Sequence, residues 1–150
     1  MSAYRTVVVG TDGSDSSLRA VDRAASIASA ADARLVIACA YYPATEREVQ
    51  RAAEALRDEA YQVVGSAPAE DTLQTAHDRA VAAGARDIVK IPVVGAPVEA
   101  LLELVGDQQA DLLVVGNRGL NTLTGRLLGS VPSDTARRAS CDVLIVHTVR

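Results

Sequence analysis

Five short apolar runs, rich in Val, Ile and Leu, alternate with segments of helical periodicity along the 150-residue chain. The runs lack a regular polar alternation, which is typical of strands that are buried on both faces of a parallel sheet. Strands that are joined by helices predict an α/β fold with helices on both faces of the sheet. The expected strands are 5–11, 33–42, 87–95, 111–116 and 142–147, and Pro92 favours an edge position for the third.

The segments between these runs carry the 3.6-residue spacing of helices. The first expected helix follows the turn-forming residues DGSDSS and extends to about Ala31, and Gly84 suits the position just past a helix end. No linker or low-complexity tract interrupts the pattern, so we expect residues 1–150 to form a single domain. The remaining helices are expected at 45–64, 71–84, 96–107 and 131–139.

Composition excludes several classes of protein. The net charge is −4 and no basic stripe with interleaved aromatic residues occurs, which argues against a nucleic-acid partner. No apolar run reaches the ~18–20 residues that span a bilayer, and the first ten residues do not resemble a secretory signal. Cys39 and Cys141 each lie in or beside an apolar run, so we expect buried thiols rather than a disulfide, and a cytoplasmic protein.

A glycine motif follows the fourth expected strand. Residues 116–130, GNRGLNTLTGRLLGS, have the spacing Gly-x2-Gly-x9-Gly-Ser. Ligands of open α/β sheets bind beyond the carboxyl ends of the strands, where glycine can adopt positive φ or let a ligand approach the backbone. Gly129 and Ser130 lead into the last helix, whose free N–H groups suit a phosphate. The motif therefore indicates an anion-binding loop, with a purely turn-forming role as the alternative.

Three stretches of the chain resemble the universal stress protein family: VVVGTDGS near the start, VVGAP in the middle and VVGNRGLNTLTGRLLGS near the end. The resemblance covers essentially the whole chain and is strongest for small single-domain actinobacterial members, some of which prefer cyclic AMP. In this family the motif formed by Gly116, Gly119, Gly129 and Ser130 marks members that bind ATP. The resemblance implies a Rossmann-like, open parallel sheet of five strands in the order 3-2-1-4-5, and usually a homodimer.

The resemblance also implies a set of nucleotide-binding residues. Residues of the first two strands would hold the adenosine, the end of the fourth strand would meet the ribose, and the glycine loop would surround the phosphates. Pro132 departs from the family pattern by removing one N–H donor, and Asp142 stands where many members have Pro. The implied set is Gly10, Thr11, Asp12, Ala38, Ala40, Gly116, Asn117, Arg118, Gly119, Leu120, Asn121, Thr122, Gly129, Ser130 and Val131.

The predicted function is that of an adenine-nucleotide-binding stress protein, a sensor or carrier with ATP or cyclic AMP as ligand and Mg²⁺ accompanying ATP. A weak ATPase and a structural stress protein without nucleotide stay open as alternatives. No catalytic residue or dedicated metal site is expected, because there is no Walker A motif, Lys90 lies elsewhere, and His77 and His147 are isolated. This chain lacks the lysine that a receiver domain carries at the end of its last strand, which argues against a receiver domain. It also lacks the G-x-S-x-G motif of a serine hydrolase.

The last expected strand indicates how two copies could associate. In the implied strand order it forms an edge of the sheet, and Val143–Val146 contain no charge or proline. Exposed strand edges of this kind pair with other chains unless they are protected. We therefore expect a homodimer through Val143–Val146.

Overall fold

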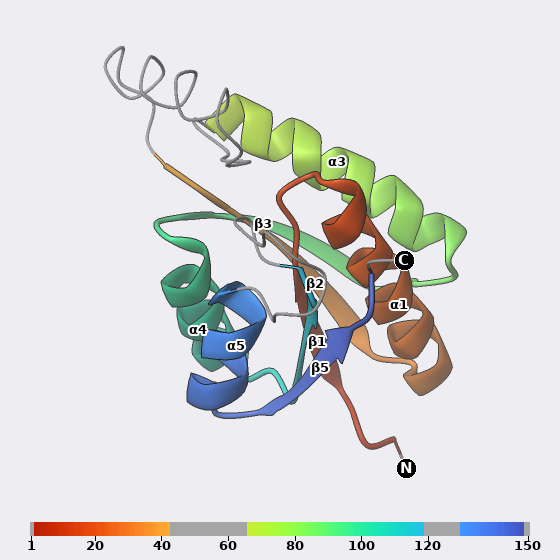
Figure 1. Ribbon diagram of the computed structural model, residues 1–150. Coiled ribbons are helices and arrows are strands. Elements are labelled where there is room, and N and C mark those ends of the chain that lie inside the picture. Colours follow the sequence, from red (N-terminus) through yellow and green to blue (C-terminus); the bar gives the residue numbers. More distant parts are fainter. Residues whose placement is uncertain (1, 43–65, 119–129, 149–150) are drawn as a thin grey trace.

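A computed structural model describes residues 2–42, 66–118 and 130–148 (Figure 1). Within these residues a single five-stranded parallel sheet has the order β3-β2-β1-β4-β5, which confirms the predicted fold class and strand order. The helix expected at 45–64 lies outside the described residues. The elements are β1 (Thr6–Gly10), α1 (Asp15–Ala31), β2 (Arg34–Tyr41), α3 (Ser66–Ala82), β3 (Ile88–Val94), α4 (Pro97–Asp107), β4 (Leu112–Gly116), α5 (Ser130–Arg138) and β5 (Asp142–Val146).

Helix α3 begins earlier than its sequence predicts. The stretch GSAPAED was expected to precede the helix, yet α3 starts at Ser66 and includes Pro68. Proline is tolerated there because the N–H groups of the first helical turn have no intrahelical acceptor. The other end agrees with expectation: Gly84 has φ of 101°, and its N–H donates to the Val81 carbonyl at 3.0 Å. The N–H of Ala85 donates to Ala80 at 3.1 Å, which completes a Schellman ending.

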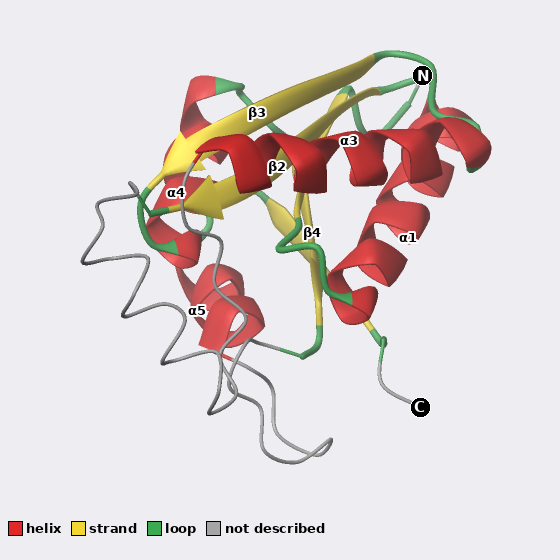
Figure 2. Ribbon diagram, turned by 90° about the horizontal axis from the view of Figure 1, so that it is seen from above, coloured by secondary structure: helices red, strands yellow, loops and turns green. Residues whose placement is uncertain are grey.

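The helices divide between the two faces of the sheet according to the direction in which the strands are added. Helices α1 and α3 connect β1 to β2 and β2 to β3, and both pack on one face. The chain then crosses to the far side of β1, so α4 and α5 cover the opposite face (Figure 2). This division follows from the right-handedness of parallel crossovers. The winding of the sheet therefore reverses between β1 and β4.

Alternate residues of the central strands build two separate cores. In β1, Val7 and Val9 face the helices α1 and α3, whereas Val8 faces α4 and α5. All three side chains are fully buried. A strand that is covered on both faces must be apolar at every position, which explains the continuous valine run.

Small residues let the layers approach closely. The chain contains no Phe or Trp, and the buried face of α1 consists of Leu18, Ala20, Val21, Ala24, Ala25 and Ala28. Alanine leaves little space to fill between a helix and a sheet, so dense packing is reached without large rings. No helix in the described ranges has the length and apolar character needed to cross a membrane.

Truncating a central core residue should destabilise the protein strongly. Leu113 on β4 is fully buried, and we expect Leu113→Ala to lower the free energy of unfolding by ~2–5 kcal/mol through lost burial and a new cavity. Val81→Ala is the control, because the Val81 side chain is 53% exposed; its effect should stay within ~0.5 kcal/mol. Urea denaturation followed by circular dichroism measures both, and equal effects would contradict the assigned core.

Candidate functional site

A pocket opens at the carboxyl ends of the strands, where the winding reverses between β1 and β4. Its cavity volume is about 80 Å³, several times the ~10–15 Å³ that one buried water needs. Switch points of open α/β sheets are the usual ligand sites of such folds. The described lining consists of Gly10, Thr11, Asp12, Ser14, Ser17, Ala38, Ala40, Pro97, Leu101, Val115, Gly116, Arg118, Val131 and Pro132.

The residues between β1 and α1 form one rigid side of the pocket. Thr11 is almost fully buried, and its hydroxyl lies 2.8 Å from the Ser17 hydroxyl while it accepts from the Gly13 N–H at 3.1 Å. Gly13 has φ of 85°, a conformation that favours glycine. Ser14 caps α1, because its hydroxyl accepts from the Ser17 N–H at 3.2 Å. These bonds hold the turn in place before any ligand arrives.

Asp12 projects from this turn and is the one acidic residue of the described lining. Its Oδ1 accepts from the Ser14 N–H at 2.9 Å, and its own N–H donates to the Ser17 hydroxyl at 3.3 Å. Within the described residues its Oδ2 has no hydrogen-bond partner. One carboxylate oxygen thus orients the side chain, and the other is available to a hydroxyl or amino group of a ligand.

Strand β2 continues beyond the end of β1. The Thr11 N–H donates to the Ala38 carbonyl at 2.9 Å, whereas on the other side the Gly95 N–H donates to Tyr41 at 2.9 Å. Backbone groups alternate in direction along a strand, so those of Ala40 point the same way as those of Ala38, past the last residue of β1. Among the described residues the Ala40 N–H has no partner. Its backbone therefore faces the pocket as an open hydrogen-bonding edge.

Two glycines of the pocket differ in how tightly they are packed, since only at Gly10 would a Cβ come closer than ordinary van der Waals contact. A Cβ on Gly10 would lie 3.0 Å from both Leu101 methyl carbons, and one on Gly116 would lie 3.4 Å from the Ser16 hydroxyl and the Thr148 methyl group. Neither glycine is among those with positive φ. Positive φ, one of the two uses that were expected, therefore does not apply to Gly10 or Gly116, and close approach of a ligand to their backbone stays a prediction.

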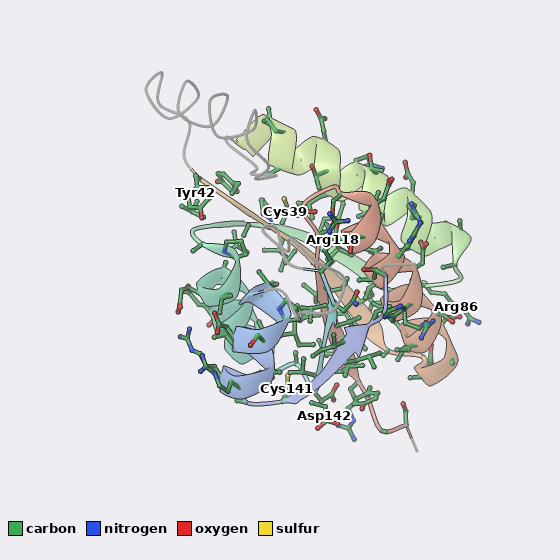
Figure 3. The ribbon with its side chains drawn as sticks, viewed as in Figure 1. Cys39, Tyr42, Arg86, Arg118, Cys141 and Asp142 are labelled. Atoms are coloured by element: carbon green, nitrogen blue, oxygen red, sulfur yellow. The ribbon has the colours of Figure 1, made fainter. Side chains whose placement is uncertain are left out.

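The anionic side of a ligand would meet Arg118 and the start of α5. Arg118 is exposed and lines the pocket, and Figure 3 shows it near the carboxyl ends of the strands, with Cys141 and Asp142 at the opposite end of the sheet. Pro132 is fully buried in the first turn of α5, where its missing N–H breaks no helical hydrogen bond. A guanidinium and a helix start both favour negative charge.

The structure brings together many of the predicted residues but not all of them. The Asn117 side chain turns away from the pocket and bonds to the His147–Thr148 segment, and Ser130 begins α5. Those in the pocket are Gly10, Thr11, Asp12, Ala38, Ala40, Gly116, Arg118 and Val131. Those outside the described residues are Gly119, Leu120, Asn121, Thr122 and Gly129.

Sequence reasoning missed several residues of the lining. Ser14 and Ser17 were interpreted as helix-start residues, and the repeated serines of DGSDSS were the signal that could have added them. Pro97 and Leu101 reach the pocket from α4, which follows β3 at the far edge of the sheet. Only the packing of α4 over β1 and β2 brings those two residues close.

The described lining of the pocket contains few ionisable groups. Lys90 lies on the edge strand β3, where its ammonium donates to the Gln74 side chain at 2.8 Å. In the parts of the chain that the structure describes, no group of three His, Cys, Asp or Glu residues could hold a metal ion. What the described lining offers is backbone edges, hydroxyl groups, one carboxylate and one guanidinium.

The sheet and its pocket define a small, doubly wound α/β protein with a ligand-sized hollow at the switch point. The model of the universal stress protein family matches residues 3–147. The chain therefore belongs to the universal stress protein family, as the motifs implied. It is also similar, at 62% identity over 148 residues and 99% of both chains, to universal stress protein Rv1636 of Mycobacterium tuberculosis strain H37Rv.

Solved structures with the same fold include close and distant sequences. A universal stress protein crystallised in complex with cAMP has a TM-score of 0.77 and 57% identity, and the match covers 99% of this chain and 100% of that one. The universal stress protein UspA from Lactobacillus plantarum has a TM-score of 0.76 at 21% identity, and the match covers 97% of this chain and 99% of that one. The second likeness concerns the fold alone.

The two thiols should differ in reactivity. Burial, with a smaller contribution from the charge of Asp12, raises the pKa of the Cys39 thiol to about 12. Cys39 is fully buried, whereas Cys141 is partly exposed. Neither cysteine forms a disulfide bond. In the Cys141→Ser variant at pH 8, we expect iodoacetamide to leave Cys39 unmodified while the protein is folded. The same reagent should modify Cys39 once urea has unfolded the protein.

The control for this labelling is Cys39→Ala, whose remaining thiol at Cys141 should react in the folded state; mass spectrometry reads both variants. Because the folded pKa of Cys39 lies above the ~8.5 of a free thiol, its contribution to stability is present below that pH and is lost as pH rises toward 12. Rapid labelling of Cys39 in the folded protein would contradict its assigned burial.

Proposed function

We propose that this chain binds an adenine nucleotide in the pocket between β1, β2 and β4, and acts as a cytoplasmic nucleotide sensor or carrier in the stress response. The observation that carries the proposal is the meeting of residues from three strand ends and α5 in one hollow at the switch point. The cAMP complex of a family member with 57% identity to this chain supports the same ligand class.

The open edge of β2 suits the base. The Ala40 N–H is a donor, and among the described residues the carbonyl of Ala40 accepts one weak contact, of 3.8 Å from the Cys39 thiol. Adenine carries an acceptor at N1 and a donor at its N6 amino group, so a backbone edge with one group of each kind can pair with it. Alanine side chains at 38 and 40 leave space for a flat ring beside that edge.

The polar side of the pocket suits the ribose and phosphate. The Asp12 Oδ2, which has no partner among the described residues, can accept from a ribose hydroxyl, and Arg118 with the start of α5 favours a phosphate. A charged hydrogen bond contributes ~1.5–3 kcal/mol, and a helix N-terminus adds ~0.3–1 kcal/mol. The phosphate contacts alone therefore leave binding weak, and the base and ribose contacts are needed for micromolar affinity.

Cyclic AMP and ATP are the two ligands we propose, with Mg²⁺ accompanying ATP. The related cAMP complex favours cyclic AMP, and the glycine motif of residues 116–130 is the one the family uses for ATP. We propose binding without rapid turnover, since the described lining contains no lysine and no second carboxylate beside Asp12 to activate water.

Filling the base side of the pocket should abolish nucleotide binding. Ala40 lines the pocket and is only partly buried, so Ala40→Leu should place its larger side chain where we put adenine. We expect at least tenfold weaker binding of cyclic AMP and ATP, a loss of ~1.4 kcal/mol or more. Isothermal titration calorimetry with cyclic AMP, AMP, ATP and GTP measures this for wild type and variant.

The matched control is Ala136→Leu, which enlarges an exposed alanine on α5 outside the lining. That variant should bind all nucleotides as the wild type does. Failure of the wild type to bind any adenine nucleotide would overturn the proposed function. Equal nucleotide affinities of wild type and Ala40→Leu would show that the base does not bind at the end of β2.

We also propose a homodimer through the edge strand β5. Among the described strands β5 pairs only with β4, and Val143, Leu144 and Ile145 stay partly exposed in one chain. Pairing with a second copy would cover these side chains and satisfy the free backbone groups of the edge. Multi-angle light scattering of the purified protein should give twice the mass of 15.6 kDa. A monomer at micromolar concentration would contradict the interface.

A further inference from the structure

Thr148 is the centre of a hydrogen-bond cluster behind one wall of the pocket. Its side chain is only 4% exposed although it lies two residues from the last position of the chain. Its N–H and its hydroxyl both contact Asn117 Oδ1 at 2.9 Å, and its carbonyl accepts from the Arg19 guanidinium at 2.6 Å. Its hydroxyl also bonds to the Ser16 hydroxyl. Every polar group of Thr148 is thus engaged by another element.

The donors and acceptors of this cluster can be assigned. A backbone N–H can only donate, so the Asn117 atom that faces Thr148 is the carbonyl oxygen, which leaves the Asn117 amide group 3.3 Å from His147 Nδ1. The Thr148 hydroxyl donates its proton to the same oxygen and must therefore accept from Ser16. Removing the Thr148 hydroxyl would leave Ser16 without an acceptor in the cluster.

The cluster joins two segments that line the pocket. Asn117 lies between Gly116 and Arg118, and Ser16 precedes the pocket residue Ser17. A Cβ on Gly116 would lie 3.4 Å from the Thr148 methyl group, which is ordinary van der Waals contact, so Thr148 packs directly beside Gly116. Thr148 therefore lies behind the backbone of Gly116, on the side away from the ligand space.

We propose that Thr148 is a positioning residue for the anionic part of the ligand. It holds the segment that follows β4 against the start of α1, and so fixes the position of Arg118, which we place beside the phosphate. The role rests on the proposed nucleotide binding and goes beyond it, since Thr148 itself touches no ligand. The base side of the pocket, at β2 and α4, lies outside this cluster.

The test compares two probes, cyclic AMP and adenosine, which share a base and differ in the phosphate. Thr148→Val keeps the shape of the side chain and removes its hydroxyl, and we expect about tenfold weaker binding of cyclic AMP, the size of one lost buried hydrogen bond. Adenosine affinity should change less than about twofold. Thr148→Ser keeps the hydroxyl and should restore cyclic AMP affinity to within about twofold of wild type.

Thr6→Val is the control, because this threonine lies at the opposite end of β1 from the pocket; both affinities should stay at the wild-type values. Calorimetry on proteins with matched circular dichroism spectra reads all variants. Equal losses for cyclic AMP and adenosine would show a general structural role and overturn the proposal, as would unchanged cyclic AMP binding in Thr148→Val.

A second variant covers the case in which Thr148→Val does not fold. Ser16→Ala removes the other hydroxyl of the same contact from the first turn of α1. It should again weaken cyclic AMP binding and spare adenosine, and unchanged cyclic AMP affinity would overturn the proposal. A wild-type protein that binds neither cyclic AMP nor ATP would instead overturn the proposed function, and this inference with it.

Discussion

The arrangement of the site depends on the position of β1 at the centre of the sheet. Its three valines are buried on both faces, so β1 accepts a neighbour on each side and a helix layer above and below. The chain adds β2 and β3 on one side and β4 and β5 on the other. Because crossovers are right-handed, this change of side carries α4 and α5 to the opposite face. The helices then diverge at the carboxyl end of β1, and the pocket lies in the space between them.

Much of this architecture could be predicted from local pattern. The apolar runs predicted each strand limit to within one residue. For the central strands this is because a strand that is buried on both faces is apolar along most of its length. Pro92 indicated an edge strand because it cannot donate to a neighbour, and β3 is an edge. The start of α3 was wrong by five residues because the sequence pattern did not reveal that Pro68 lies in the first turn of the helix.

The candidate site was less predictable wherever it depends on contacts between distant elements. Asp12 and Ala40 were implied by the resemblance to the family, and their place at strand ends agrees with the rule that ligands bind at the carboxyl edge. Leu101 reaches the pocket only because α4 packs over β1 and β2, and the local sequence spacing does not predict that contact. Asn117 stands within the glycine motif, yet its side-chain carbonyl oxygen accepts hydrogen bonds from Thr148, thirty-one positions later in the chain. Motif position therefore predicts proximity to the site better than it predicts the role of a side chain.

The overhang of β2 beyond β1 has an evolutionary consequence. If the base is recognised through the main chain of Ala40, its recognition does not depend on any particular functional group at that position. Exchanges between the smallest residues would be neutral there, while a branched or aromatic residue would block the ligand. Descendants of such a gene could lose the ligand in a single mutational step and keep the fold, so an intact sheet alone does not guarantee a working receptor.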